Sequence, residues 1–212
     1  MTWTCRQHSD ACQSYVQGGR NWNEQGIKLQ DVINFQLPDE EIIYAARCLQ
    51  WIGAGHGNMD ALHFLEQSNL IEGVYSTKAL KDAFEAFTFL MLKDKLAEWD
   101  LLEAHRLLMR NQLLEEKYIG HYRDCMVFVS NRVPPIPSKV PNLMKNWLRA
   151  IKVPASETEC KRTHIAFERI HPMIDGNGRL GRMLLNWQRM KSNLPILTIY
   201  ERERYRYYEW FG

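Results

Sequence analysis

The fold and the chemistry of this chain are decided by one stretch, His171-Pro172-Met173-Ile174-Asp175-Gly176-Asn177-Gly178-Arg179-Leu180-Gly181-Arg182. Gly176 and Gly178 flank Asn177 where an apolar pattern of helical spacing begins, with Leu180, Met183, Leu184 and Trp187. Backbone N–H groups converge at the start of a helix, where the helix dipole also favours anions. The stretch therefore predicts an anion-binding nest at a helix N-terminus.

Charged residues around this nest supply the other groups that phosphate chemistry needs. Arg179 and Arg182 lie three apart, which places both guanidinium groups on one helix face within reach of one polyphosphate. Asp175 precedes the nest, where a carboxylate oxygen could hold a Mg²⁺ ion that bridges phosphates. His171 lies one loop upstream, where it could take a proton from an incoming hydroxyl group.

The stretch resembles the signature of the Fic family, H-x-F-x-D/E-G-N-G-R-x-x-R, and departs from it only at Met173, where the family usually has Phe. In the family that Phe packs into the core beneath the loop. Met is apolar, similar in length and adaptable, so we expect slightly looser support and unchanged chemistry. A structural histidine before a glycine-rich turn is the alternative, and the number of correctly spaced positions disfavours it.

The resemblance implies a protein adenylyltransferase, which transfers AMP from ATP to a Ser, Thr or Tyr hydroxyl of a target protein and releases pyrophosphate. ATP and Mg²⁺ are the cofactors that it implies. The implied roles are a general base at His171, a Mg²⁺ ligand at Asp175, a cradle for the α- and β-phosphates at Gly176, Asn177, Gly178 and Arg179, and a γ-phosphate ligand at Arg182. The related Doc branch phosphorylates instead and typically carries Lys for the second Gly, so the intact Gly178 argues against it.

A second motif lies far upstream. Ser68-Asn69-Leu70-Ile71-Glu72-Gly73 resembles the inhibitory motif Ser/Thr-x-x-x-Glu-Gly/Asn that many Fic proteins carry, here N-terminal to the Fic core. Ser68 and Glu72 lie four apart on one helix face, and Gly73 can end that helix in the left-handed conformation. We expect Glu72 to pair with Arg182 and so to misalign ATP for attack. A solvated surface Glu before a helix-ending Gly is the alternative.

Residues 123–133 are the one segment with strand character. They are rich in β-branched and aromatic residues and are followed by Pro134, Pro135 and Pro137, which cannot continue a ladder. We predict a short β-hairpin that resembles the Fic flap, which lies over the nucleotide and pairs its edge with the target. The flap residues that we expect to bind the target are Met126, Val127, Phe128 and Val129. A packing hairpin without this role is the alternative.

Helical periodicity dominates the rest of the chain, so the fold class is all-α, a Fic-type helical bundle with the flap over the active site. Helices are predicted over 42–49, around Leu80 to Met91, near 100–112 and just before His171, and a terminal aromatic segment should pack on the core. We divide the chain into an N-terminal helical extension, residues 1–64, and a Fic catalytic domain, residues 65–212. The inhibitory helix falls near 65–73.

Composition narrows the class of protein. The 212 residues are 45% hydrophobic and carry a formal net charge of +2, so the chain can bury a core and has no excess of basic residues for nucleic acid. Five cysteines without regular spacing indicate a reducing compartment. We find no signal peptide pattern and no apolar run that could span a bilayer. We expect a cytoplasmic protein that does not bind membranes, and a homo-oligomer remains open.

Alternatives to an autoinhibited adenylyltransferase remain. Glu72 could position a water that removes AMP from a modified target, which is the reverse, deAMPylating activity. A toxin-like or regulatory binding module without turnover is a second alternative, and the intact His171 and Asp175 argue against it. The sequence names neither the target nor the signal that relieves inhibition.

Overall fold

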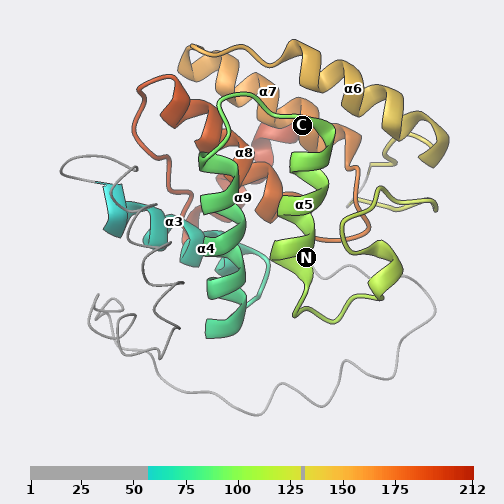
Figure 1. Ribbon diagram of the computed structural model, residues 1–212, viewed down its shortest axis with the longest axis horizontal. Helices are drawn as coiled ribbons and strands as arrows, with labels where there is room; N and C mark the ends of the chain where they lie inside the picture. The colour runs from blue at the N-terminus through green and yellow to red at the C-terminus, as the bar shows by residue number, and fades with distance from the viewer. Residues whose placement is uncertain (1–56, 130–131) are drawn as a thin grey trace.

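A computed structural model describes residues 57–129 and 132–212 (Figure 1). These residues form seven α-helices, which are α3 (Gly57–Ile71), α4 (Thr77–Met91), α5 (Glu98–Met109), α6 (Val140–Ala150), α7 (Glu157–Ile170), α8 (Asn177–Lys191) and α9 (Arg204–Tyr208). Single 3₁₀ turns lie at Glu116–Tyr118, Pro137–Lys139, Glu201–Glu203 and Glu209–Phe211. The predicted all-α class is therefore confirmed.

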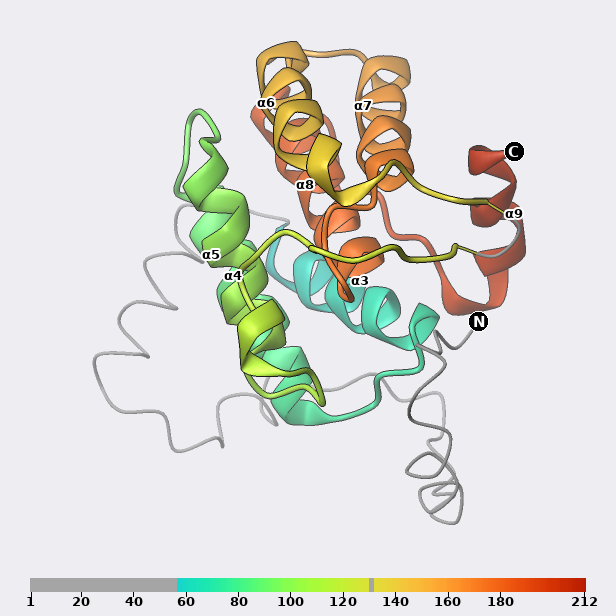
Figure 2. The same cartoon turned by 90° about the vertical axis from the view of Figure 1, so that its right-hand side faces the viewer.

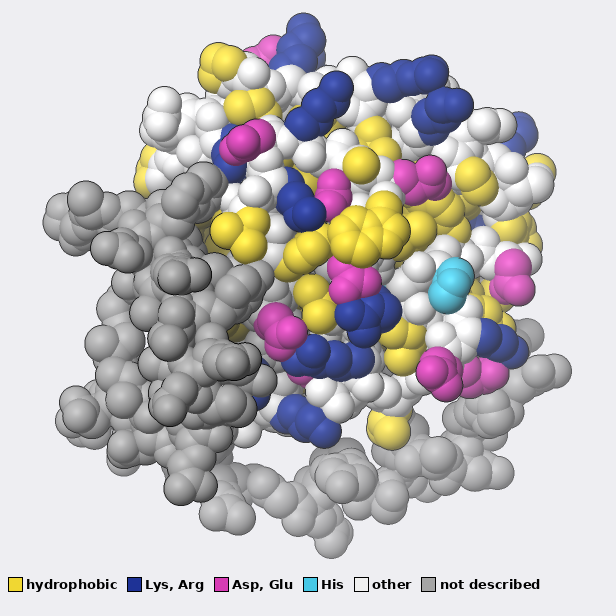
Figure 3. Space-filling view, in the orientation of Figure 1, with side chains coloured by type: hydrophobic (Ala, Val, Ile, Leu, Met, Phe, Trp, Pro, Cys, Tyr) yellow, Lys and Arg dark blue, Asp and Glu magenta, His cyan; other side chains and the backbone are white. Residues whose placement is uncertain are grey.

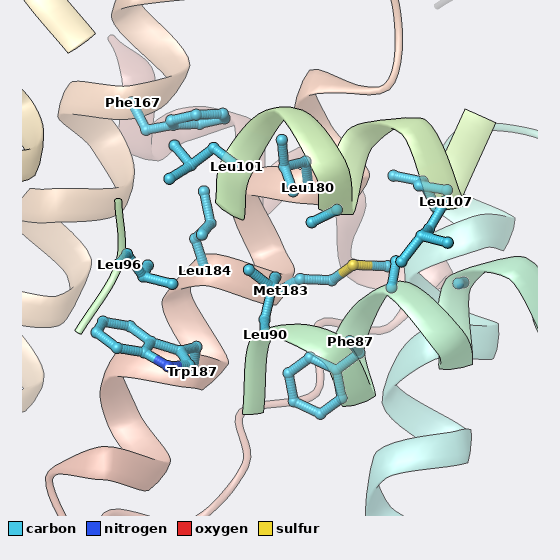
Figure 4. Packing of buried hydrophobic residues seen from close by; sticks show 14 of the residues in the cluster. Phe87, Leu90, Leu96, Leu101, Leu107, Phe167, Leu180, Met183, Leu184 and Trp187 are labelled. Carbon is cyan, nitrogen blue, oxygen red and sulfur yellow. The ribbon is translucent and has the colours of Figure 1, made fainter. Parts of the chain in front are cut away.

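Helix α8 lies at the centre of this bundle and positions the nest. It contacts α3, α4, α5 and α7, and its apolar side chains share one hydrophobic cluster with Phe87 of α4 and Leu101 of α5 (Figure 4). Trp187 and Met183 are buried in that cluster, and burial of such a side chain contributes roughly 1.5–3 kcal/mol to stability. The first turn of α8, which carries the nest, is thus held by a packed core.

Helix ends follow from local sequence. Ser156 and Glu159 form a capping box at the start of α7: the Ser156 N–H donates to Glu159 Oε2 at 2.8 Å, and the Glu159 N–H donates to Ser156 Oγ at 3.3 Å. Ser76 caps α4 in the same manner, with its Oγ accepting from the Ala79 N–H at 3.0 Å. Each cap satisfies backbone donors that the helix itself leaves open.

The helices predicted around Leu80 to Met91, near 100–112 and before His171 are confirmed as α4, α5 and α7. The helix predicted for residues 42–49 lies outside the described part of the chain, as do residues 1–56 of the proposed extension. Helix α3 runs through residues 64 and 65, between which we placed the boundary of the catalytic domain. The division at that residue stays a prediction.

The β-hairpin predicted for the flap is not confirmed. Within the described residues, segment 123–133 holds one isolated antiparallel bridge, in which Val129 and Arg132 exchange two backbone hydrogen bonds of 2.9 Å. Pro134 and Pro135 have no N–H to extend the pairing. In addition, the carbonyl groups of Cys125 and Pro135 accept from a side chain, Arg123, instead of from a facing strand.

The terminal aromatic segment packs back onto α3, as predicted. Figure 2 shows the C-terminal turns beside the bundle. The Glu201 N–H donates to Gln67 Oε1 at 3.0 Å, and Ile71 shares a small hydrophobic cluster with Ile199 and Tyr207. The end of the chain therefore braces the helix that carries the second motif.

In Figure 3, several basic side chains lie along the upper edge of the described surface. Elsewhere on that face, basic and acidic side chains are interspersed around a hydrophobic strip. Exposed apolar residues include Trp99, whose ring lies 5.5 Å from Lys93 Nζ. None of the helices in the described ranges combines the length and the apolar character needed to cross a membrane.

Candidate active site

His171 stands at the junction between α7 and the signature loop. It follows the last residue of α7 in the left-handed conformation (φ 51°, ψ 64°), and its N–H still donates to the Phe167 carbonyl at 3.0 Å. The residue is 5% exposed. Burial and, after it, the charges of Arg123 and Arg132 lower the pKa of His171 to about 4. At neutral pH the imidazole is therefore uncharged and able to accept a proton.

Asn177 and Met173 shape the loop itself. Asn177 Oδ1 accepts from the Met173 N–H at 2.8 Å, and Asn177 Nδ2 donates to the Met173 carbonyl at 3.0 Å. The Asn177 side chain thus closes the turn and does not point outward, while its main chain stays in the nest. Met173 is fully buried in the main core, where the sequence predicts support for the loop.

Helix α5 supports the loop from below through His105. Its Nδ1 accepts from the Gly120 N–H at 2.9 Å, so its Nε2 carries the hydrogen and donates to the Asp175 carbonyl at 3.0 Å. Gly176 approaches α5 closely with φ +76°, and a Cβ there would lie 2.8 Å from Met109 Sδ. Both the conformation and the contact require glycine.

Arg179 is the cation of the nest. Its Nη2 lies 3.7 Å from Asp175 Oδ2 and 3.2 Å from Met109 Sδ. Its Nε and Nη1 are buried and have no hydrogen-bond partner within the described residues. Buried donors without partners are costly, which is the arrangement expected where an anionic ligand completes the site.

Arg182, one turn further along α8, is already bound. Its Nε donates to Ser68 Oγ and its Nη2 to the Ser68 carbonyl, both at 2.9 Å. The same Nη2 pairs with Glu72 Oε1 at 2.8 Å. The ion pair predicted between Glu72 and Arg182 is present, and Gly73 ends the helical turn with φ +72°. The predicted inhibitory triad, Ser68, Glu72 and Gly73, therefore lies at the site.

The Glu72 carboxylate also covers the nest. A Cβ built on Gly178 would collide with Glu72 Oε1 and would lie 3.0 Å from Arg182 Nη1. An anionic group of the chain itself thus rests against the second glycine of the signature. Arg179 and Arg182 are not free for one polyphosphate together while Glu72 stays there.

Arg182 is held from behind by a polar relay. His164 Nδ1 lies 3.0 Å from the Gly181 carbonyl, which can only accept, so Nδ1 carries the hydrogen and Nε2 accepts from the Tyr207 hydroxyl at 2.9 Å. The Tyr207 oxygen then faces Arg182 Nη1, at a long 3.5 Å. Burial lowers the pKa of His164 to about 3, so this neutral tautomer persists.

Glu168 lies beneath the same region. It is 8% exposed, and its Oε1 has no hydrogen-bond partner among the described residues. Burial raises the pKa of Glu168 to about 8; the charge of Arg182 opposes this shift and that of Glu72 adds to it. The carboxyl group is thus largely protonated at neutral pH, which leaves Glu72 as the anion that pairs with Arg182.

The flap residues singled out from the sequence are accessible. Met126 is 44% and Phe128 68% exposed, while Val127 and Val129 are half-buried. The segment from α5 to α6 runs past the signature loop (Figure 2), where the Arg123 N–H donates to the Pro172 carbonyl at 2.9 Å. This hydrogen bond joins the start of the segment to the loop that follows His171.

The carboxylate of Asp175 is a suitable ligand for Mg²⁺. Its side chain is 47% exposed, and its Oδ1 accepts from the Gly176 N–H at 2.6 Å. The described residues contain no group of three or more side chains that could hold a metal ion. Mg²⁺ commonly takes one or two carboxylates and completes its shell with phosphate oxygens and water, so one carboxylate beside a phosphate nest suffices.

Three residues support the site although no motif singles them out. In the sequence, His105 is typical of a core or boundary residue, His164 of a residue that packs on the site or supports it, and Tyr207 of a terminal helix that packs on the core. Each is buried and supports the site through hydrogen bonds. The one signal in the sequence was an imidazole or phenol within an otherwise apolar pattern, which does not identify a partner.

Comparisons with known proteins agree with this geometry. Residues 95–188 match the model of the Fic/DOC family. Proteins named "Protein adenylyltransferase Fic" are 33% identical over 118 residues in Nematostella vectensis and 32% identical over 114 residues in Drosophila yakuba. These matches cover 53% and 51% of this chain but 27% and 23% of the relatives, so the chain spans about a quarter of their length.

Solved structures share the fold. A signaling protein with a Fic domain from Bacteroides thetaiotaomicron superposes with a TM-score of 0.61 at 18% identity, over 79% of this chain and 73% of that one. A Fic family protein from Desulfovibrio desulfuricans gives 0.57 at 23% identity, over 82% and 66%. The signature geometry, the family match and the shared fold agree: residues 95–188 of this chain match the Fic/DOC family.

Proposed function

We propose that the chain is an autoinhibited protein adenylyltransferase that transfers AMP from ATP to a hydroxyl group of a target protein. One observation carries the proposal: among the residues that the structure describes, the buried Nε and Nη1 of Arg179 at the N-terminus of α8 have no hydrogen-bond partner, and His171 is uncharged. A site of this kind binds phosphate and accepts a proton within the same few residues. The names of the similar proteins support the same reaction.

His171 acts as the general base. The target hydroxyl gives its proton to the imidazole as its oxygen forms a bond to the α-phosphorus. The bond from that phosphorus to the oxygen of the β-phosphate breaks, and pyrophosphate leaves with that electron pair. The lowered pKa of His171 keeps the ring ready to accept over the whole neutral range.

The first turn of α8 binds the phosphates. Arg179 uses its free donors, and the main-chain N–H groups of Gly176, Asn177 and Gly178 add the positive end of the helix dipole. Arg182 binds the γ-phosphate when Glu72 has left it. Asp175 would hold Mg²⁺, which supplies charge neutralisation on the α- and β-phosphates when bound.

Glu72 is the inhibitory residue. Its carboxylate occupies Arg182 and lies against Gly178, so a triphosphate entering the nest meets a negative charge and lacks its γ-phosphate ligand. Ser68 adds two hydrogen bonds to the same guanidinium. ATP can then enter only with its α-phosphate out of line for attack.

The target protein docks on the flap. Met126, Val127, Phe128 and Val129 offer an apolar edge whose backbone can pair with an extended segment of the target. Such pairing fixes the hydroxyl and depends little on side-chain identity.

We also keep the predictions that the protein is cytoplasmic and that nucleic acid is not a partner, and self-association stays open.

DeAMPylation is the second candidate. The observation that favours it is the Glu72 carboxylate against Gly178, close to where the α-phosphate would bind and able to orient a water. A binding module without turnover and a kinase of the Doc type are further alternatives.

Labelled ATP distinguishes these functions. The protein is incubated with a lysate and with ATP labelled at the α- or at the γ-phosphate. Label transferred to protein from the α-position supports AMP transfer, whereas label from the γ-position indicates a kinase. Release of AMP from a previously modified target, without net labelling, indicates the reverse reaction. No labelling and no release, even after removal of the Glu72 side chain, would contradict the proposed enzyme.

A further inference from the structure

Arg123 is a buried cation whose guanidinium contacts are all with main-chain carbonyl groups. The residue is 2% exposed. Its Nε donates to the His171 carbonyl at 2.7 Å and its Nη1 to the Cys125 carbonyl at 3.1 Å. Its Nη2 donates to the carbonyls of Pro135 and, at 3.4 Å, of Ile170. Among the residues that the structure describes, no carboxylate forms an ion pair with it.

The C-terminus of α7 explains why a lone cation is stable there. The last carbonyl groups of a helix have no partner within the helix and form the negative end of its dipole. Ile170 and His171 present such carbonyls to Arg123. The planar guanidinium can serve several acceptors at once, which an ammonium group on a flexible stem does less well. The contact also holds His171 in its left-handed conformation.

The same side chain holds both arms of the flap. Cys125 precedes the exposed flap residues and Pro135 follows them, and the carbonyl groups of both accept hydrogen bonds from Arg123. The main-chain N–H of Arg123 also donates to the Pro172 carbonyl at 2.9 Å. One residue therefore joins the base, the loop after it and the two ends of the flap.

We propose that Arg123 is a positioning residue, which fixes the distance between His171 and a target segment bound on the flap. The inference rests on the proposed function, because the flap is there the surface that holds the target hydroxyl. A hydroxyl held by one element reaches a base on another only if the two elements are rigidly joined. Misplacement by about 1 Å can cost about a hundredfold in rate.

The charge of Arg123 has a second effect on the base. Burial is the main cause of the lowered pKa of His171, and Arg123 and then Arg132 contribute in the same direction. The charge of Glu72 and a hydrogen bond from the His171 ring to the backbone of Glu168 act in the opposite direction. Loss of the Arg123 charge should therefore raise the pKa of His171, whereas loss of its geometry alone should not.

Two substitutions separate geometry from charge. Arg123→Lys keeps the charge and cannot reach all four carbonyls, while Arg123→Met removes both. Arg149→Met, at an exposed position on α6, removes one positive charge elsewhere and is the control. All three are made in the Glu72→Gly protein, and kcat and KM for ATP are measured by transfer of α-labelled AMP to protein.

We expect Arg123→Lys to lower kcat by about tenfold to a hundredfold, with KM for ATP unchanged because Arg123 touches no phosphate site. Arg149→Met should change neither constant. By NMR, the titration midpoint of the His171 ring should rise by about one unit in Arg123→Met and stay near the reference in Arg123→Lys. Unchanged kcat in both variants, or a rise in KM alone, would overturn the inference.

Two measurements keep this test separate from the proposed function and from misfolding. If Glu72→Gly with Arg123 intact transfers no AMP, the proposed function fails, and the His171 titration still tests the contact. If circular dichroism shows that neither variant folds, hydrogen exchange in the wild-type protein tests the contact instead. Its Arg123 Nε–H should exchange with solvent far more slowly than that of Arg149, and equal rates would show that the contact is absent.

Discussion

Glu72 and Arg182, which come from opposite parts of the sequence, form an ion pair of 2.8 Å between Oε1 and Nη2. The two partners differ in burial: the Arg182 side chain is 1% exposed and that of Glu72 is 23% exposed. Arg182 is also fixed by Ser68 in front and Tyr207 behind. The Arg182 guanidinium is therefore held in place, and the Glu72 carboxylate is the partner that can leave and be replaced by a phosphate.

Glu72→Gly should raise self-labelling or target labelling with α-labelled ATP by about tenfold or more. Removal of the carboxylate frees Arg182 and clears the space beside Gly178. A charge-assisted hydrogen bond of this kind contributes about 1.5–3 kcal/mol, which corresponds to that gain. Rates are compared with wild type at equal concentration.

The control for Glu72 is Glu66→Ala, which removes another acid from α3 without touching Arg182. It should leave labelling unchanged. The double variant Glu72→Gly with Arg182→Ala should lose most of the gain, because the freed guanidinium is what the γ-phosphate uses. Equal or lower labelling in folded Glu72→Gly protein would rule out inhibition of AMP transfer by Glu72. A role for Glu72 in removing AMP from a modified target would then remain.

His171→Ala should abolish AMP transfer and retain ATP binding. A positioned base contributes about 10² to 10⁴ in rate, and His171 lies at the end of α7, apart from the nest at the start of α8. Calorimetric titration with ATP in the Glu72→Gly background measures binding separately from rate. Near-full transfer by the folded variant would remove His171 from the role of base.

Asp175→Ala should abolish the activity that depends on divalent ions. Its half-exposed carboxylate lies beside the nest, where we propose that it holds a phosphate-bound cation. The rate of the Glu72→Gly protein is followed as Mg²⁺ is removed by a chelator and then restored. Activity that does not change on chelation would show that Asp175 holds no metal.

Sequence patterns were sufficient to predict features that depend on residues close together in the chain. The nest, the apolar face of α8 and the left-handed turn at Gly73 follow from spacing, whereas the pairing of Glu72 with Arg182 was expected from the resemblance of two motifs to those of the Fic family. The roles of these residues in the reaction remain predictions until the variants are measured.

Contacts that depend on tertiary packing were not predictable. The β-branched residues of the flap segment predicted a hairpin. In the structure, however, the carbonyls of Cys125 and Pro135 accept hydrogen bonds from the Arg123 side chain. Periodicity also gave no sign that Tyr207 reaches His164 and Arg182 from the end of the chain. Such pairs join segments far apart in sequence, and local pattern carries no information on them.

Tyr207→Phe tests the relay behind Arg182. The variant keeps the ring, which lies 5.5 Å from the Arg182 guanidinium carbon, and removes the hydroxyl that faces Nη1. In the Glu72→Gly protein we expect KM for ATP to rise a few-fold with kcat nearly constant, because Arg182 binds the γ-phosphate and not the reacting centre. His164 Nε2 loses its partner, which should cost about 1–3 kcal/mol of stability. A loss of kcat at constant KM would contradict this role.

Glu168 should make the protein less stable as pH rises from about 6.5 to 8. Its pKa in the folded state is raised to about 8 from 4.5, so between these values the folded protein binds a proton that the unfolded chain releases. The free energy of unfolding therefore falls as pH increases, by up to about 1.4 kcal/mol per unit. His164 and His171 have lowered pKa values and act in the opposite direction, but only below about 6.5, where the unfolded histidines take up protons.

Glu168→Gln provides the measurement. The amide cannot ionise, so urea unfolding of this variant between pH 6.5 and 8 should show nearly constant stability, while wild type declines. Below pH 6.5 the buried histidines affect both proteins equally, and the contribution of Glu168 persists in wild type alone down to about pH 4.5. Labelling by α-labelled ATP at pH 7 should change little, because the carboxyl group is already neutral there and Glu72 remains the anion on Arg182. A wild-type stability that is flat from pH 6.5 to 8 would mean that Glu168 is ionised in the folded protein.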